Sequence, residues 1–460
     1  MSSKPKDYSW MTKDKLMTYT FFALLAIAIV TIVMWWGVSS SDMMTGATVG
    51  MDFGLTVLIN CLIAIGIAVG IDVLLNKVTV DSPLNIMSAA VFGLIVAMSY
   101  SVGEPVMRAS EVLPLVGPQS FIYVALITVV GMVLFKKLQG LKRKYVNPAA
   151  AAKLLVLAFV GIFTVLIPAD HLLSGGLQVP SLAGPVGYDV IGGNGAAGFG
   201  FYVYSCFANP MLQLPSAVSQ SDVFNLLFLQ KFHGWPGGAS SIAVIVVGIV
   251  LFALLRRYIK WRITAAYFAS VAVTAVILNF VFPGGDLLLR LGFSLFVGSS
   301  IFLAFFMATD PASTPLTYLG QIIFGVGLGV LTVLLQTVGF FGGSILALVI
   351  MNLTSPVLDR VGKLKPATEK KEPKLPKAKA FAAEKVKVYD CIRCGACMRV
   401  CCHNLSPILI KQAFDKQNFD AMIKLNADYC DGCGHCSFVC PSRIDLKGSV
   451  LRAKAMLRQQ

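Results

Sequence analysis

The stretch CIRCGACMRVC at residues 391–401 and the stretch CDGCGHCSFVCP at residues 430–441 decide how the C-terminal part of this chain folds. Each holds four cysteines with the spacing C-x-x-C-x-x-C-x-x-x-C. Two short turns followed by a fourth cysteine supply the four thiolates that a cubane iron–sulfur cluster needs. Zinc ligands rarely come as two complete runs of this kind, and disulfides would leave the repeat unexplained. The sequence therefore predicts two [4Fe–4S] clusters.

The spacing also predicts how the eight thiolates are shared. In bacterial ferredoxins with two clusters, the fourth cysteine of each run ligates the cluster of the other run. We therefore expect a small bacterial-ferredoxin-like α+β domain at residues 389–460. The predicted ligand sets are Cys391, Cys394, Cys397 and Cys440 for the first cluster and Cys430, Cys433, Cys436 and Cys401 for the second.

The rest of the chain is too apolar for a soluble protein. Of its 460 residues, 56% are hydrophobic and 13% are charged, whereas soluble domains carry about 25% charged residues. Apolar segments of about 20 residues cross the hydrocarbon core of a bilayer as helices. The sequence thus predicts a mostly α, polytopic membrane protein of about ten transmembrane helices. The predicted segments lie near residues 16–38, 54–76, 83–100, 118–136, 148–168, 240–256, 263–282, 287–307, 317–337 and 340–358.

Lysine and arginine predict the orientation of these helices. Basic residues cluster in alternate loops, at 136–144 and 256–262, and in the terminal segments, whereas the opposite loops hold little beyond Arg108 and Lys231. The positive-inside rule places both termini in the cytoplasm, where thiols stay reduced. We expect the inner membrane of a bacterium. The same bias explains the net charge of +15, so no nucleic-acid partner is expected.

A change of composition separates two predicted domains. The transmembrane domain is predicted at residues 1–358 and the cluster domain at 389–460. Residues 359–388 include the Lys/Pro-rich stretch KLKPATEKKEPKLPK, which cannot bury a core and is expected to be a linker. It is either a solvated tether or a contact for anionic lipid headgroups.

The transmembrane domain is predicted to hold two inverted repeats of five spans each. An odd number of spans per half places the halves in opposite orientations. A sequence echo supports this, because NPAAA at residues 147–151 and DPASTP at residues 310–315 both start a helix with a capping residue followed by proline. Helix N-termini favour anionic ligands, although ordinary capping explains the same pattern. Asn147, Pro148, Asp310 and Thr314 are therefore candidate binding residues.

At these residues the chain resembles a known family. NPAA at 147–150, FMATDPASTPLT at 306–317 and GAS at 238–240 resemble the RnfD/NqrB membrane subunits of the Rnf ion-translocating electron transport complex, a ferredoxin:NAD⁺ oxidoreductase, and of the related sodium-pumping quinone reductase. The resemblance covers residues 15–358. CIRCGAC at 391–397 and CSFVCPSRI at 436–444 resemble the two-cluster ferredoxin module of RnfC, whose NADH-binding and flavin-binding parts have no counterpart in this chain.

The resemblance implies a flavin in the membrane domain. The family holds FMN on the outer side by a phosphoester bond to threonine in a Ser/Thr-Gly-Ala-Thr motif. Gly238, Ala239 and Ser240 match its end, with Ser240 in place of threonine, and Gly234 replaces the usual upstream acid. The alternatives are a glycine-rich turn that caps a helix, or FMN or riboflavin bound without a covalent bond near Asn147 and Asp310.

Other ionisable residues have two interpretations. Asp72, Asp286 and Arg290 fit either interfacial anchoring or an ion pathway. Cys402, where ferredoxins usually have proline, is expected to be a buried spectator rather than a competing ligand. The four histidines have no paired spacing, so neither zinc catalysis nor haem is indicated.

We expect an electron-carrying subunit of an ion-translocating oxidoreductase, passing electrons between cytoplasmic clusters and membrane-bound flavin and coupled to Na⁺ or H⁺ movement. Cofactors would carry the chemistry. Implied partners are other Rnf-like membrane and flavin subunits, a ferredoxin or NADH-oxidising subunit, and membrane lipid. The alternatives are a small-solute transporter with a redox-sensing ferredoxin module and a membrane anchor that merely docks ferredoxin domains.

Overall fold

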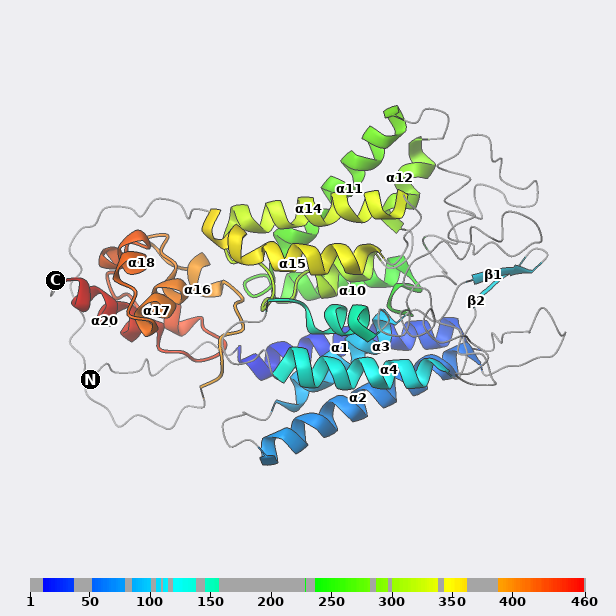
Figure 1. The fold of residues 1–460 in the computed structure, drawn as a ribbon, viewed down its shortest axis with the longest axis horizontal. Helices are drawn as coiled ribbons and strands as arrows, with labels where there is room; N and C mark the ends of the chain where they lie inside the picture. Colours follow the sequence, from blue (N-terminus) through cyan, green and yellow to red (C-terminus); the bar gives the residue numbers. More distant parts are fainter. Residues whose placement is uncertain are drawn as a thin grey trace, which may run out of the picture.

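A computed structural model describes most of the helical part of the chain (Figure 1). The candidate residues Gly234 and Asp286 and the cysteine Cys206 lie outside the described residues. The described ranges are 11–36, 52–78, 85–100, 105–108, 111–114, 119–137, 145–156, 228, 236–281, 287–296, 300–337, 343–361 and 388–458.

The first half of the membrane domain is a bundle in which α2 packs along α3 and α4, and α1 packs against α2 and α3. A short antiparallel hairpin pairs Pro105 with Pro114 at the end far from the C-terminal domain. Residues 148–156 form a further helix. The elements are α1 (Lys13–Met34), α2 (Phe53–Val78), α3 (Ile86–Ser99), β1 (Pro105–Arg108), β2 (Glu111–Pro114), α4 (Gln119–Val130) and the π-helix η1 (Gly131–Lys137).

The second half is a further group of packed helices. Helix α11 packs along α14, which packs along α15, and α10 lies against α1 of the first half. The elements are η3 (Pro236–Gly238), α10 (Ser241–Leu254), α11 (Trp261–Val281), α12 (Leu287–Phe296), α13 (Ser300–Phe302), the π-helix η4 (Leu303–Met307), α14 (Tyr318–Thr337) and α15 (Gly343–Val361).

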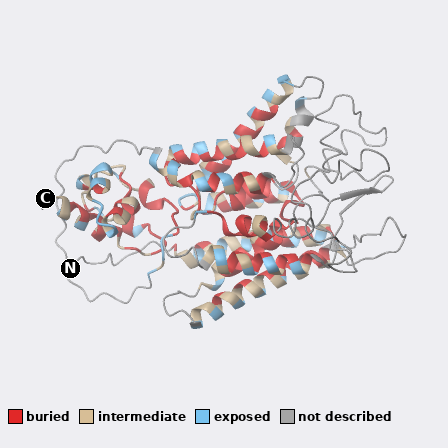
Figure 2. Cartoon of the chain, viewed as in Figure 1, coloured by how far each residue is buried: buried red, intermediate tan, exposed pale blue. Residues whose placement is uncertain are grey.

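The helices have the character of membrane spans. Residues coloured as buried lie on the inner faces of the helices (Figure 2), while large apolar side chains such as Leu62, Val246 and Phe280 are exposed, as contact with lipid requires. Among the described residues, four helices are long and apolar enough to cross a membrane, namely Lys13–Met34, Gly54–Lys77, Trp261–Val281 and Tyr318–Leu335. All ten predicted segments contain helix within the described residues, but the number of spans remains a prediction.

The two halves start at opposite ends of the bundle. The N–H of Lys13, at the start of α1, donates to the Pro441 carbonyl of the C-terminal domain at 3.0 Å. Thr31, near the end of α1, donates to the Pro236 carbonyl just before α10 at 2.8 Å. Helices α1 and α10 therefore run in opposite directions (Figure 1). The inverted repeat itself remains a prediction, since residues 157–227 are not described.

The C-terminal domain differs from the expected α+β fold, because residues 388–458 contain helices and no strand. The segment between the two cysteine runs folds into α17 and α18, whose apolar side chains pack against α20 in a core that includes Ile410, Met422 and Val450. The elements are α16 (Ala396–Arg399), α17 (Pro407–Asp415), α18 (Phe419–Lys424), the 3₁₀-helix η5 (Ala427–Tyr429), α19 (His435–Phe438) and α20 (Leu446–Arg458).

Candidate iron–sulfur centres seated on the membrane domain

The structure brings the eight candidate cysteines together in two groups. One cavity is lined by Cys391, Cys394, Cys397 and Cys440. A second cavity is lined by Cys401, Cys430, Cys433 and Cys436. Each group takes three cysteines from one run and the fourth from the other, which is the grouping that the sequence predicts.

The backbone of each run is shaped for this grouping. Arg393 and Gly432, each just before the second cysteine of its run, have φ angles of 55° and 76°. This left-handed conformation turns the N–H of Arg393 to the Cys391 sulfur at 3.3 Å and the N–H of Gly432 to the Cys430 sulfur at 3.4 Å. Gly432 adopts it without steric cost, whereas Arg393 does not. N–H groups directed at sulfur fit an iron–sulfur cluster, whose potential they tune.

Burial changes the chemistry of these thiols. It raises the pKa of Cys394 and of Cys436 to about 12, and it raises the pKa of Cys397 well above its usual value. Without iron these thiols would be protonated at neutral pH. Cluster assembly must therefore release protons, because only thiolates ligate iron.

The first cysteine group lies against the membrane domain. Leu316, in the Asp-Pro segment of that domain, shares one apolar core with Cys397 and Cys440 of this group and with Cys436 of the second group. Cys394 and its neighbour Ile392 join the apolar core of the membrane helices. No comparable contact with the described membrane helices is made by Cys401, Cys430 or Cys433, which are exposed or half-buried.

Asp359 at the end of α15 joins the two domains. Its Oδ1 accepts from the N–H of Leu316 at 2.7 Å, and its Oδ2 pairs with the Arg393 guanidinium at 2.7 Å. Both side chains of the pair are less than a tenth exposed. Arg399 adds donations to the carbonyls of Arg256 and Ile259 in the turn after α10. A buried charged pair held by a further hydrogen bond fixes the geometry of the interface, because removing either partner leaves a buried charge unpaired.

Lys260 supports this interface from the membrane side. Its buried ammonium donates to the carbonyls of Pro311 and Thr314 and to the Thr314 hydroxyl, each at 2.9 Å. Lys260 thereby fixes the Asp-Pro segment, and Leu316 of that segment packs against the cysteines. The sequence signalled Lys260 only as part of a basic loop and Asp359 only as the start of a linker, so neither was identified as a site residue.

The candidate flavin residues occupy two places. The Asn147 side chain accepts from the N–H groups of Ala149 and Ala150, and its Nδ2 donates to the Met307 carbonyl at 3.2 Å. The two echoed motifs therefore lie side by side. Pro148 is the first residue of the helix at 148–156.

Asp310 accepts from the N–H of Ala312 and the hydroxyl of Ser313, and the Thr314 hydroxyl donates to the Asp310 carbonyl. The prediction that Asp310 starts a helix is wrong: residues 310–317 form turns and α14 begins only at Tyr318, because Pro315 has no N–H to continue a helix from Pro311. Asp310 therefore holds a turn, whereas Asn147 caps a helix.

Ser240 lies at the other end of the bundle. Its hydroxyl accepts from the N–H of Ala243 at 3.3 Å and so caps α10, with Ala239 and Gly238 buried in the turn before it. The far end of α10 leads to the turn that Arg399 contacts. Ser240 is therefore separated from the cysteine groups by the length of α10.

Comparison with known proteins identifies the membrane domain. Residues 1–367 match the NQR2, RnfD, RnfE family, and residues 390–444 match the 4Fe-4S dicluster domain. The chain belongs to the NQR2, RnfD, RnfE family. The resemblance seen in the sequence is thereby confirmed, as is a multi-pass, mostly helical membrane protein with an iron–sulfur domain.

Membrane subunits of several ion-translocating complexes are similar to this chain. A subunit of the proton-translocating ferredoxin:NAD(+) oxidoreductase complex of Clostridium ljungdahlii is 31% identical over 31% of this chain and 42% of its own length. A subunit of the ion-translocating oxidoreductase complex of Methanosarcina acetivorans is 29% identical over 42% of this chain and 64% of its own. A subunit of the Na(+)-translocating NADH-quinone reductase of Ectopseudomonas mendocina is 33% identical over 29% of this chain and 33% of its own. The matches thus span less than two thirds of each relative.

The structure gives contacts for two buried ionisable residues of this family member. Asp72 is buried and its Oδ2 accepts from the N–H of Asn85 at 3.0 Å, so it stabilises the start of α3. Lys153, which the sequence did not single out, is buried in the bundle and donates to the Ser99 carbonyl. Arg290 lies in α12, with its side chain outside the described residues.

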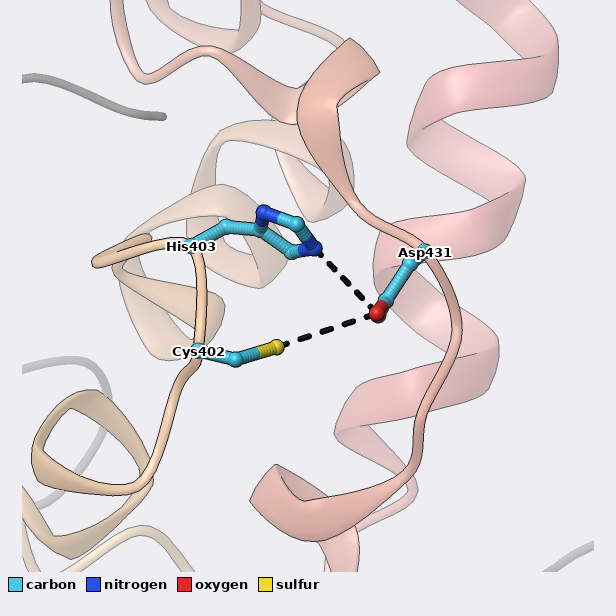
Figure 3. Close-up of side chains that lie close together, drawn as sticks. All are labelled: Cys402, His403 and Asp431. Atoms are coloured by element: carbon cyan, nitrogen blue, oxygen red, sulfur yellow. Dashed lines mark hydrogen bonds and ion pairs between the residues drawn. The ribbon is translucent and has the colours of Figure 1, made fainter. Parts of the chain in front are cut away.

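The prediction for Cys402 as a buried spectator is wrong. Its thiol is exposed, because the chain turns outward after Cys401, where Asn404 has a φ of 55°. His403 and Asp431 lie beside Cys402 (Figure 3), so a histidine without sequence pairing does have a polar cluster around it.

Proposed function

We propose that this chain is an electron-carrying membrane subunit of an Rnf-type ferredoxin:NAD⁺ oxidoreductase complex that moves Na⁺ or H⁺ across the membrane. The support comes from the family of the membrane domain, from the complexes to which similar subunits belong, and from the iron–sulfur domain fused to this one. As a translocase subunit, the chain would work with other Rnf-like membrane and flavin subunits and with a ferredoxin or NADH-oxidising subunit.

We propose two ligand sets with distinct roles. Two [4Fe–4S] clusters, when bound, exchange single electrons with donors and acceptors. The set of Cys401, Cys430, Cys433 and Cys436 is the more exposed and would face the soluble electron donor. The set of Cys391, Cys394, Cys397 and Cys440 packs against Leu316 and would face the membrane domain. The observation that carries the proposal is this contact, fixed by the Asp359–Arg393 pair.

The proposed path leads on to a flavin in the membrane domain. The Asn147 and Asp310 motifs lie in the half of the bundle that carries the cysteine groups, since Asn147 contacts Met307 and Lys260 holds the Asp-Pro segment. An FMN or riboflavin held there would be the nearer acceptor, whereas FMN at Ser240 would lie at the opposite end. Positive-inside bias puts the cysteine groups in the cytoplasm and Ser240 outside. Loss of flavin fluorescence in Ser240→Ala would support the outer site.

The test removes the charge of Asp359 and keeps its shape. Asp359→Asn leaves the buried Arg393 guanidinium without its charged partner, which is costly in a dry interface. In purified complex we expect full iron content, unchanged reduction of the clusters by the soluble donor, and flavin reduction slowed at least about tenfold, since small misplacements of redox partners cost rate.

Asp415→Asn is the matched control, because Asp415 pairs with Lys411 on the exposed surface of α17. Its flavin reduction should match the wild type. Equal flavin reduction in Asp359→Asn and wild type would contradict the proposed route, and a preparation active without iron would contradict the electron-carrying role altogether.

A further inference from the structure

Three potential metal ligands converge beside the second cysteine group. His403 Nε2 lies 3.2 Å from Asp431 Oδ2, and Cys402 Sγ lies 3.7 Å from the same oxygen. All three ligand atoms lie within 4.8 Å of one another. Figure 3 shows the three side chains pointing toward a common point from two separate loops. None of the three belongs to the predicted ligand sets of the clusters.

The two loops hold these side chains in place independently of any added metal. Asp431 Oδ1 accepts from the N–H of Cys433 at 3.0 Å, which fixes the carboxylate and leaves Oδ2 facing the other two residues. On the other loop, the N–H of Asn404 donates to the Cys401 carbonyl at 3.2 Å, which closes a turn around Cys402 and His403. The side chains of His403 and Asp431 are 15% and 22% exposed, so an ion from solvent can reach them.

We propose that Cys402, His403 and Asp431 bind one thiophilic divalent cation, with Zn²⁺ as the best fit. Tetrahedral zinc with bonds of about 2.0–2.3 Å places its ligand atoms about 3.3–3.7 Å apart. The Cys402–Asp431 separation of 3.7 Å lies in this range, and the His403–Asp431 separation of 3.2 Å lies just below it. A thiolate and a carboxylate neutralise the 2+ charge, and imidazole nitrogen, thiolate and carboxylate are all normal zinc donors. The exposure of Cys402 leaves the fourth position to water.

Binding of the cation moves protons and requires no oxidation or reduction. The Cys402 thiol loses its proton to solvent, and His403 also releases the Nε2 proton that it directs at Asp431 Oδ2. Nδ1 keeps the remaining proton, and Nε2 donates its lone pair to the ion. The ion replaces the His403–Asp431 pair, which is weak because solvent reaches both side chains. Cys402 Sγ also lies 3.9 Å from Cys433 Sγ, so the competing role for this thiol is replacement of Cys433 at the cluster.

The experiment uses the full chain, purified anaerobically with both clusters loaded and without a polyhistidine tag. Zn²⁺ is titrated against a competing chelator, and zinc and iron are counted together. We expect one tightly bound zinc per about eight iron atoms. With Co²⁺ as the probe, a thiolate-to-cobalt charge-transfer band should appear. Cys402→Ser should abolish this band, and both Cys402→Ser and His403→Gln should weaken zinc binding at least about tenfold, with iron content unchanged.

His435→Gln is the matched control, because His435 is an exposed histidine of the second cysteine run outside this cluster, and its zinc binding should equal that of the wild type. Zinc binding that is equal in wild type, Cys402→Ser and His403→Gln would overturn the proposal. So would a wild-type cobalt complex without the charge-transfer band, a result that requires no variant to fold. Iron content and cluster spectra report on the proposed electron-carrying function separately, so the two proposals can fail independently.

Discussion

At the scale of single residues, the cysteine ligands could be predicted from the sequence, whereas the charged residues that hold the two domains together could not. The eight cysteines could be grouped in advance, because their two identical spacings resemble those of two-cluster ferredoxins, in which the fourth cysteine crosses to the other cluster. Lys260, Asp359 and Arg393 could not, since each sits in an ordinary local setting and its partners lie far along the chain: Arg393 is 34 positions from Asp359, and Lys260 is 54 from Thr314.

The buried thiols predict opposite effects of pH on the iron-free and iron-loaded protein. Burial raises the pKa of Cys394 and Cys436 to about 12, above the value of about 8.5 for an unfolded cysteine. The iron-free fold is therefore stabilised below about pH 8.5 and loses this stabilisation as the pH rises toward 12.

Cluster binding needs thiolates, so acid favours release of iron. We expect a chelator to remove iron faster at about pH 6 than at about pH 8, followed by the loss of visible absorbance. The iron-free chain should unfold at lower denaturant concentration at about pH 10 than at about pH 8. A removal rate that is the same at both lower pH values would contradict this assignment of the thiols.

At the scale of helices, glycine sets how closely the spans pack. A Cβ at Gly93 in α3 would lie 2.5 Å from the Ala64 carbonyl of α2, and one at Gly325 in α14 would lie 2.5 Å from the Ile263 carbonyl near the start of α11. Small residues at such crossings let membrane helices approach. The apolar lengths of these helices were predictable, but the crossing points were not, since Gly66 and Gly70 look the same in the sequence and meet nothing within 4 Å.

This contrast predicts different results for two similar substitutions. Gly93→Ala forces α2 and α3 apart and should cost about 1–3 kcal/mol. Gly66→Ala, its control in α2, should be neutral or stabilise the helix by up to about 1 kcal/mol. Thermal unfolding of the two variants in detergent measures the difference. Equal midpoints would show that the α2–α3 crossing is looser than these distances indicate.

At the scale of the whole molecule, the iron–sulfur domain is seated on the end of the membrane bundle where α1 begins (Figure 1). The sequence predicted two domains and a linker, and it left their contact open, because composition carries no information about docking. Helix α15 continues to Val361 and places Asp359 under the cysteine loops, inside the segment expected to be linker. A fixed contact between the two domains would let their cofactors exchange electrons at a fixed separation.

Iron analysis of paired cysteine variants tests the shared ligand sets most directly. If Cys391 and Cys440 serve the same cluster, the double variant Cys391→Ser/Cys440→Ser should keep about four iron atoms per chain, and Cys391→Ser/Cys401→Ser should keep almost none. The reverse result, with about four iron atoms in the second double variant and almost none in the first, would contradict the crossed arrangement on which the proposed path to the membrane domain depends.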